Sequence, residues 1–465
     1  MGSITVIQSQ KEGAVWHRQL PPVCFQPDIN GEEMRLLMIY SDIRYQEVKG
    51  FGGALTQASA YCYDGLDEAH KQELLKLYFS KEGLAYNAGR THIGSCDFSF
   101  GNYNYCVKKE ESLDSFSLAC DEDYVLPFLK QVTDYCVGSF SLFASPWSPP
   151  AWMKTNNSLI HGGELKEEYY PLYAEYLARY IKEYEKAGIR VDRITIQNEP
   201  KAVQTWESCI YTPEQEKRFI CDYLYPRFQK EGINTKIIIW DHNKERVFTR
   251  ARAILSDPAA REIVSGIAFH WYSGDHFENL RLCWEFFPDK ELLFTEGCVE
   301  LTTTATSMAE KAAQSGNQKA DVENSPWEFG EYYAHDMIGN FNNGMSTFID
   351  WNLALDMQGG PNHVGNYCSA PVICDIQEQK LYLQPSYYFI GHFSKFIPIG
   401  SRRIAYSTYN GDLMTSAFIT PEQKKVVVVL NKTGRDIPFT LKDEASDQIA
   451  FLTANAKSIM TLIYE

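Results

Sequence analysis

Apolar and polar residues follow two alternating patterns along the chain. Short apolar runs have the length of buried strands, and segments with apolar residues three or four positions apart lie between most of them. Eight such runs are present: EVKGFGGA, YNAGRTHI, SFSLFASPW, DRITIQNE, KIIIWDH, GIAFHWY, ELLFTEG and STFIDWNLAL. Strands that alternate with helices predict an α/β fold with a parallel sheet.

The segment EEYYPLYAEYLARYIKEYEKAG carries the clearest helical pattern. Its apolar positions recur at helical spacing and predict one buried face, made of Tyr173, Leu177, Tyr180, Ile181 and Tyr184. Gly188 follows as the expected end of the helix. The segments DEAHKQELLKLYFSKEG and TPEQEKRFICDYLYPRFQKEG have the same shape, so helices are expected there too.

The number of strands selects the architecture. Eight strands over residues 48–390 predict a (β/α)8 TIM barrel, whose usual size is ~250 residues. The alternative is a doubly wound open sheet, which would carry a GxGxxG motif after its first strand. The nearest stretch, GFGGAL at Gly50, lacks that spacing, so the barrel is favoured.

Both ends of the chain have a different pattern. Short β-rich runs separated by turns occur in the tail, as in KKVVVVLNKT and DIPFTLKD, and in the head, as in MRLLMIYS. We therefore expect one small antiparallel β-domain built from both chain termini, residues 1–47 together with 391–465. The polar stretch Thr302–Pro326 predicts a long, mobile loop within the barrel domain.

Polar and aromatic residues stand where the predicted barrel strands end. In this fold the loops after the strands form one mouth, and active sites are built there. The strand ends carry Asp97, Trp147, Asn198-Glu199-Pro200, His270-Trp271-Tyr272, Glu296 and Asp350-Trp351-Asn352. We expect all of them to gather at this mouth.

Glu199 and Glu296 share one context, an apolar strand followed by Glu and a turn residue. A lone glutamate at such a place is most often an ion-pair or capping partner. Two in matching positions, with Trp and Asn around them, favour glycoside hydrolysis. That reaction needs one ionised carboxylate to attack the sugar and a second, with a raised pKa, to protonate the leaving oxygen.

Other chemistries fit the sequence less well. His270, Asp275 and His276 have none of the spacings typical of metal sites, so no metal is expected. Cys298 has no obvious activating base nearby. The twelve cysteines include no CxxC pair, so most are expected to be reduced.

Charge and hydropathy bear on partners and location. The net charge of −16 argues against a general nucleic-acid binder, which would normally present a basic face. No signal peptide or transmembrane segment is recognisable, so a cytoplasmic protein without stable membrane insertion is expected. The sequence does not indicate an oligomeric state.

Several longer motifs resemble glycoside hydrolase family 30, in the branch of the glucosylceramidases (acid β-glucosidases) and their bacterial relatives. They run in order from Phe51 to the C-terminus and include GFGGALTQASA, SCDFSFGNYNY, ASPWSPPAWMKTN, TIQNEP, HWY, FTEGC, DWNLALDMQGGPN and GHFSKFIPIGSRRI. The resemblance implies an eightfold barrel with a small β-domain, and hydrolysis of β-glycosides with retention of configuration. It implies no cofactor, and a glycoside or glycolipid as substrate.

The resemblance also implies roles for individual residues. Glu199 in QNEP would be the general acid/base and Glu296 in TEGC the nucleophile. Residues expected to hold or wall the sugar are Asp97, Trp147, Asn198, Trp351 and Asn362. His270 and Tyr272 in HWY would orient the nucleophile, and Trp206, in a loop that looks like bacterial relatives, would face the leaving group.

Two alternatives stay open at this stage. Sister branches of the family act on xylosides, so a β-xylosidase or a dual β-glucosidase/β-xylosidase is possible from the motifs. A non-catalytic carbohydrate-binding barrel is the alternative from another class, since fold does not fix function. Both carboxylates are present, which favours an enzyme.

Overall fold

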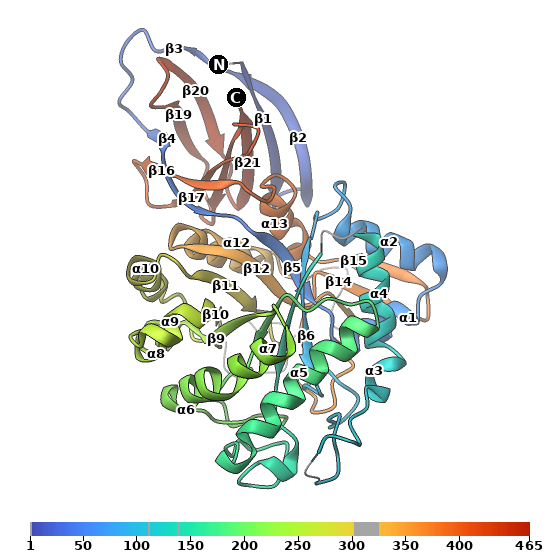
Figure 1. Ribbon diagram of the computed structural model, residues 1–465. Coiled ribbons are helices and arrows are strands. Elements are labelled where there is room, and N and C mark those ends of the chain that lie inside the picture. Colours follow the sequence, from blue (N-terminus) through green and yellow to red (C-terminus); the bar gives the residue numbers. More distant parts are fainter. Residues whose placement is uncertain (1, 110–111, 137–139, 302–324) are drawn as a thin grey trace.

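Eight parallel strands close into a barrel at the centre of the larger domain (Figure 1). The computed structural model describes residues 2–109, 112–136, 140–301 and 325–465. Neighbouring barrel strands follow one another in sequence, and β12 closes on β5. The strands are β5 (Gly50–Ala54), β6 (Ala88–Ile93), β7 (Ser141–Pro146), β8 (Arg193–Thr195), β9 (Lys236–Asn243), β10 (Val264–His270), β11 (Glu291–Glu296) and β12 (Met345–Asn352). All eight predicted strands are confirmed.

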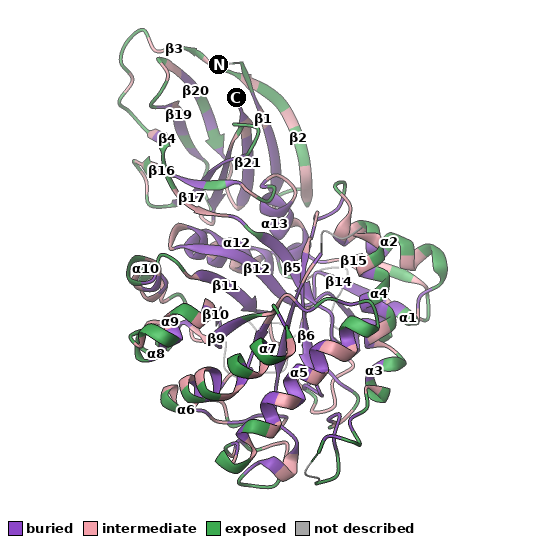
Figure 2. Cartoon of the chain, viewed as in Figure 1, coloured by how far each residue is buried: buried purple, intermediate pink, exposed green. Residues whose placement is uncertain are grey.

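Helices lie around the barrel, and most have an exposed outward face, whereas α12 and α13 are covered by the second domain and the barrel strands are buried (Figure 2). They are α1 (Gln57–Asp64), α2 (Glu68–Phe79), α3 (Ala119–Glu122), α4 (Val125–Tyr135), α5 (Tyr170–Lys186), α6 (Pro213–Arg218), α7 (Tyr225–Glu231), α8 (Val247–Leu255), α9 (Pro258–Ile263), α10 (Phe277–Phe286), α12 (Trp327–Asn342) and α13 (Pro385–Ser394). A π-helical turn, Phe219–Leu224, joins α6 to α7. Short 3-10 turns lie at Ala151–Met153, Glu167–Tyr169 and Lys244–Arg246.

The helix signals in the sequence are confirmed. The five apolar residues predicted for one face of α5 are all fully buried. Gly188 follows the helix with φ of +81°, a conformation that glycine adopts readily. At the start of α6, Thr212 and Gln215 form a reciprocal capping box.

The second domain is a curved sheet of ten strands from both ends of the chain. Its order is β2-β1-β21-β18-β17-β16-β4-β19-β20-β3. The strands are β1 (Ser3–Gln10), β2 (Val15–Cys24), β3 (Gln26–Pro27), β4 (Leu36–Glu47), β16 (Arg402–Thr408), β17 (Leu413–Ile419), β18 (Lys425–Asn431), β19 (Ile437–Asp443), β20 (Gln448–Ala454) and β21 (Ser458–Tyr464). Neighbouring strands pair antiparallel, as expected, except that β4 and β19 pair in parallel.

Helix α13 joins the two domains. It packs on α12 of the barrel and on β1, β2 and β21 of the sheet, and lies between the domains (Figure 1). Its buried His392 has ring nitrogens 2.9 Å from the hydroxyls of Thr461 and Ser9, so one side chain ties the last strand to the first. The boundary predicted after residue 390 falls inside this helix.

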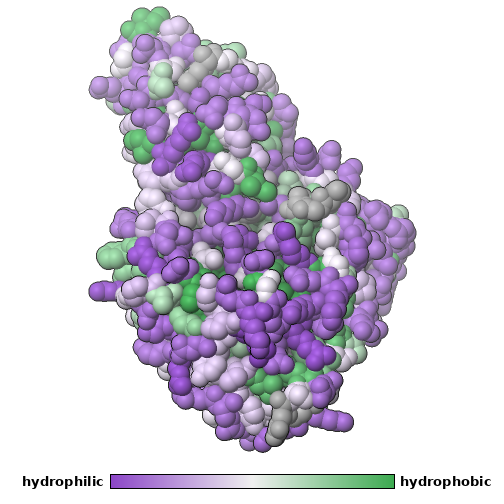
Figure 3. Space-filling view, viewed as in Figure 1, coloured by the Kyte–Doolittle hydropathy of each residue, from purple (hydrophilic) through white to green (hydrophobic). Residues whose placement is uncertain are grey.

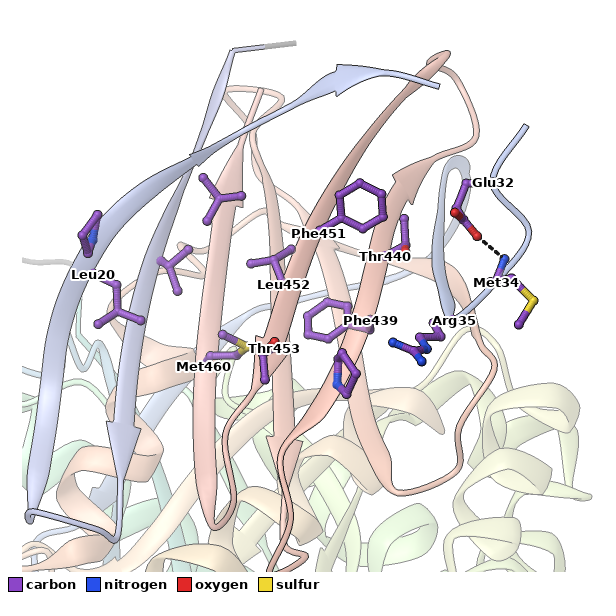
Figure 4. A pocket seen from close by; sticks show the side chains of 14 residues that line it. Leu20, Glu32, Met34, Arg35, Phe439, Thr440, Phe451, Leu452, Thr453 and Met460 are labelled. Carbon is purple, nitrogen blue, oxygen red and sulfur yellow. Dashed lines mark hydrogen bonds between the residues drawn. The ribbon is translucent and has the colours of Figure 1, made fainter. Parts of the chain in front are cut away.

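A hollow of about 640 Å³ lies in the β-domain (Figure 4). Side chains of β2, β19, β20 and β21 and of the turn before β4 line it, among them Leu20, Met34, Phe439, Phe451, Leu452 and Met460. None of the site residues predicted from sequence is among its lining residues.

Two further features complete the description. Three short strands, β13 (Ala354–Asp356), β14 (Val372–Asp375) and β15 (Lys380–Leu383), form a small sheet after β12, which the sequence did not indicate. The predicted mobile loop Thr302–Pro326 lies, except for its last two residues, outside the described residues. The surface in view is mainly hydrophilic, with apolar residues in small separate groups (Figure 3).

Packing of α5 on the barrel can be tested at Leu177, which is fully buried in the main core. Leu177→Ala leaves a cavity and should lower the free energy of unfolding by about 2–5 kcal/mol. Glu185→Ala on the exposed side of α5 is the matched control and should change it by no more than about 0.5 kcal/mol. Urea denaturation measures both, and equal small effects would contradict this packing.

Candidate active site

The period of the strands decides which residues face the barrel mouth. Successive side chains of a strand point to opposite faces, so His270 and Tyr272 lie in the site while Trp271 packs outward against Phe294, Tyr332 and Tyr333. Asp350 likewise accepts a hydrogen bond from Tyr333 of α12, at 2.8 Å. The expectation that Trp271 and Asp350 join the mouth was therefore wrong.

Arg90, on β6, links three of the polar strand ends. Its side chain is fully buried, and its guanidinium donates to Glu296 Oε2 at 2.6 Å, to Asn198 Oδ1 at 2.8 Å and to Asp241 Oδ2 at 2.9 Å. A buried cation is tolerated only when carboxylates and hydrogen bonds compensate its lost hydration. Arg90 thus fixes the positions of Glu296 and Asn198 relative to each other.

Asp241, on β9, is the fully buried partner of Arg90. Its Oδ2 also accepts from the hydroxyls of Ser145 and Thr195, and its Oδ1 from Thr295 at 2.7 Å. Burial alone would raise the pKa of this carboxyl, but Arg90 and the hydrogen bonds outweigh it and hold the pKa below its usual value. Asp241 is therefore an anion at the floor of the site.

His270 lies between three carboxylates. Its Nε2 is 3.1 Å from Asp241 Oδ1, and its Nδ1 is 3.1 Å from Glu199 Oε1 and 4.0 Å from Glu296 Oε1. Ionised carboxylates only accept hydrogen bonds, so both ring nitrogens must carry a proton to satisfy this arrangement. Burial lowers the pKa of His270, but Glu296, Asp241 and Glu199 together raise it to about 9.

The two candidate catalytic carboxylates approach the same nitrogen from different strands. The distances of 3.1 and 4.0 Å from His270 Nδ1 limit the separation of Glu199 Oε1 and Glu296 Oε1 to about 7 Å, which admits the ~5–5.5 Å of retaining glycosidases. Arg90 and the Tyr272 hydroxyl, at 2.6 and 3.0 Å, donate to the two oxygens of Glu296.

The pKa of Glu199 differs from the sequence expectation. Burial would raise it, but His242 and His270 beside the carboxyl lower the pKa below its usual value. The expected acid/base carboxyl with a raised pKa is thus not found in the substrate-free protein. The proton of this cluster resides on imidazole.

Aromatic rings wall one side of the site. Trp147 and Trp351 stack with ring centroids 5.5 Å apart, and the Arg90 guanidinium lies 4.8 Å from the Trp147 ring centre. Trp206, which is partly exposed, packs against the same cluster. These rings offer the flat apolar surfaces on which sugars stack.

Asp97 lies in the loop after β6, at the side of Trp351. It is nearly fully buried, and Asn362 Nδ2 is 3.4 Å from its Oδ2. Asn366, which sequence reasoning missed, also bonds to this carboxyl. The Oδ1 of Asn362 accepts two backbone N–H groups of its own loop, from Val364 and Asn366, so this side chain mainly shapes the loop.

Two groups of side chains contain residue types that bind metals. Asp275 pairs with His335, and His276 lies 3.9 Å from Glu278, so the histidine and aspartate grouping considered in the sequence is not formed. Glu199, His242 and His270 could each direct one ligand atom toward a common point. A histidine nitrogen binds a metal only when it carries no proton, whereas both ring nitrogens of His270 carry protons that face carboxylates. These three residues therefore fit proton exchange better than metal binding.

Besides Asn366, three residues of the charged network were not predicted from the sequence: Arg90, Asp241 and His242. Arg90 and Asp241 stand within barrel strands whose side chains are largely buried, and charged residues are rare there unless they are paired. That rarity was the available signal. His242 carried none, because its position depends on a backbone irregularity.

Comparison with known proteins assigns the chain. Residues 48–397 match the glycosyl hydrolase family 30 TIM-barrel domain, and residues 400–462 match the family 30 beta sandwich domain. The chain belongs to glycosyl hydrolase family 30. It is therefore a glycoside hydrolase, as the resemblance in the sequence implied.

One curated protein and two solved structures show what this family 30 hydrolase is similar to. It is 35% identical to the lysosomal acid glucosylceramidase of Mus musculus over 88% of this chain and 79% of that one. The crystal structure of SrfJ from Salmonella typhimurium matches with a TM-score of 0.90 and 35% identity, over 100% of this chain and 99% of the other. The endo-beta1,6-glucanase BT3312 matches with a TM-score of 0.83 and 26% identity over the whole of both chains.

One finding concerns membranes. No helix within the described residues of this family 30 hydrolase is both long and apolar enough to span a bilayer.

The charge on His270 can be tested through stability. Its pKa is raised from 6.5 to about 9 on folding, so its contribution is fully present below pH 6.5 and is lost as the pH rises through about 9. The free energy of unfolding should fall by up to about 3 kcal/mol across this window. Urea denaturation at a series of pH values measures it.

The control for this measurement is His270→Gln, which cannot titrate. Groups away from the site titrate alike in both proteins, and the lowered pKa values of Glu199 and Asp241 keep both carboxyls ionised in the wild-type protein above pH 6.5. The difference between the two pH profiles in this window therefore reports on His270. Parallel profiles between pH 6.5 and 9 would contradict a cationic His270.

Proposed function

We propose that the protein is a retaining, exo-acting β-glucosidase of the glucosylceramidase type, with Glu296 as nucleophile and Glu199 as general acid/base. The observation that carries the proposal is the pair of carboxylates within 3.1 and 4.0 Å of one histidine nitrogen. Two carboxyl groups this close, beside a tryptophan wall, suit double displacement at an anomeric carbon.

In the first step, an oxygen of Glu296 bonds to C1 of the sugar while the glycosidic C1–O bond breaks. The leaving oxygen takes a proton from Glu199, and a glycosyl ester of Glu296 forms. Arg90 and Tyr272 each donate to Glu296, at 2.6 and 3.0 Å, and hold its carboxylate in one orientation for this attack. Fixed geometry of this kind removes much of the entropic barrier.

The proton for the leaving group comes from the imidazole cluster. In the free site it lies on His270, whose Nδ1 is 3.1 Å from Glu199 Oε1. Substrate displaces water from the mouth, which favours the neutral carboxylic acid over the carboxylate. The proton then belongs to the coupled Glu199–His270 pair rather than to either residue alone.

In the second step, Glu199 takes a proton from water, whose oxygen attacks C1 and releases Glu296. Esterification has removed the negative charge of Glu296, which lies 4.0 Å from the shared histidine. With that negative charge gone, the carboxylate of Glu199 no longer has a second carboxylate beside it. The ionised form of Glu199 is therefore favoured. This is the form needed for a general base.

The sugar subsite is assigned to the residues named in the sequence. Asn198 would meet the 2-hydroxyl, since Arg90 fixes its amide beside Glu296. Asp97, Trp147, Trp351 and Asn362 would close the far end of the subsite, and Trp206 would face the leaving group. A subsite closed in this way would release single sugars from a chain end, as exo action requires.

A second candidate function is favoured by one comparison. The structural match to an endo-beta1,6-glucanase covers the whole chain, so the mouth of this barrel is compatible with a longer glucan. The higher identity to a glucosylceramidase favours a β-glucoside with an apolar or small aglycone. A β-xylosidase stays open as the alternative within exo-acting enzymes.

Replacement of either carboxylate tests the mechanism. Glu296→Gln should reduce kcat for nitrophenyl β-glucoside by roughly 10⁴-fold or more, the scale seen when a nucleophile is removed. Glu199→Ala should lose about 10²–10⁴-fold on alkyl glucosides, which need the proton, and much less on dinitrophenyl glucoside, which does not.

Rescue by azide is the control for these two variants. Azide should restore turnover of dinitrophenyl glucoside by Glu199→Ala with a β-glucosyl azide as product, because a small anion can replace the water that needs a base. An α-glucosyl azide, or full activity of Glu296→Gln, would contradict the assignment of the two glutamates.

Substrate choice can be measured directly. Nitrophenyl β-glucoside should react with a kcat/KM about 10-fold or more above that of the β-xyloside, since Asp97 and Asn362 would provide polar contacts to the hydroxymethyl end of glucose that xylose lacks. Asn362→Ala should narrow this ratio. Equal rates would favour the dual-specificity alternative, and internal cleavage of β-1,6-gluco-oligosaccharides would favour endo action.

A further inference from the structure

Strand β9 carries an irregularity at the site. Trp240 pairs with Ala268 of β10, but the next residue of β10, Phe269, pairs with His242, so Asp241 is an extra residue. Trp240 and Asp241 have φ of +75° and +54°. Non-glycine residues rarely adopt such angles, and such strain persists where the surrounding structure imposes it.

The bulge changes which side chains face the mouth. In a regular strand Asp241 and His242 would point to opposite faces, and His242 would meet the surrounding helices. An extra residue removes this alternation. Both polar side chains therefore reach the site, Asp241 at its floor and His242 nearer the opening.

His242 is directed at the candidate acid/base. Its Nδ1 is 3.3 Å from Glu199 Oε1, the same oxygen that lies 3.1 Å from His270 Nδ1. The Trp240 ring packs against the imidazole at 5.1 Å. The His242 Nδ1 is buried, and the contact with Glu199 is not aligned as a hydrogen bond, so this nitrogen has no hydrogen-bond partner among the described residues.

The other charges around His242 are already paired. Asp241 is bound by Arg90 and His270. Glu216, which accepts from the Trp240 backbone N–H, is paired with Arg250. Within the described part of the chain, Glu199 is the one carboxylate at ion-pair distance from His242.

We propose that His242 is a positioning residue for Glu199, and that it acts together with His270 on Oε1 to leave Oε2 facing the glycosidic oxygen. The inference rests on the proposed function of Glu199. Substrate tightens loosely aligned contacts in many enzymes, and the unaligned Nδ1 of His242 is placed to donate once the carboxylate is fixed. The bulge brings this second imidazole to the carboxylate.

The test separates orientation of the acid from general packing. His242→Ala should reduce kcat/KM for an alkyl β-glucoside by about 10-fold or more, with little change in KM. It should change kcat/KM for dinitrophenyl β-glucoside less than about 2-fold, since that leaving group needs no proton. His242→Gln, whose amide can donate to Oε1, should recover part of the loss.

Two controls accompany these variants. His70→Gln changes a histidine at the start of α2 that is bound to Asp67. It should leave kcat/KM unchanged for both substrates. Circular dichroism and thermal melting check that each variant is folded. Equal losses on both substrates would show a packing role for His242, and no loss on either would show no role; both results overturn the inference.

Failure of the proposed function would look different. It would appear in the wild-type protein, as a lack of turnover of any β-glucoside or β-xyloside, or as an active Glu296→Gln variant. The inference about His242 is judged from the ratio between leaving groups in its variants, whichever of the two sugars the protein prefers.

Discussion

The ion pair between Arg90 and Asp241 governs the arrangement of the barrel mouth. Both side chains are fully buried, at 2.9 Å from each other. Removing two charges from water is costly, so each must find further partners. Those partners come from neighbouring strands: Asn198 after β8, His270 on β10 and Glu296 on β11. The strands must close in this register for the charges to be compensated, and the same contacts orient the carboxylates.

The backbone around this ion pair adopts unusual φ angles. Glu199, Trp240 and Asp241 all have positive φ, and the Glu199 N–H donates to the Asp241 carbonyl at 2.9 Å. Strain of this kind collects at functional sites and is held by the packing around them. Below the site the barrel is filled by a layer of apolar side chains, Ala88, Phe143, Ile238, Ala268, Leu293 and Ile349. This layer gives the charged network an apolar floor.

Two imidazoles lie against the same oxygen of Glu199. His270 is fully buried between carboxylates, while the His242 side chain keeps 12% of its surface exposed and lies toward solvent. A buried cation beside Glu199 explains why this carboxyl does not hold the proton before substrate arrives. In the proposed mechanism, acid and base behaviour therefore belong to the cluster of Glu199 and His270 and change with what occupies the mouth.

The sequence by itself determined the eight barrel strands, the buried face of α5 and the two glutamates at strand ends, because these depend on patterns within single short segments. Only the tertiary structure decided that Arg90 meets Glu296, that β4 pairs in parallel with β19 and that Trp271 points outward. Arg90 and Glu296 are 206 residues apart along the chain, and Asp241 and His242 face one way only because β10 imposes a bulge on β9. Local propensity cannot encode such relations, since they arise when strands distant in sequence pair and must share their buried charges.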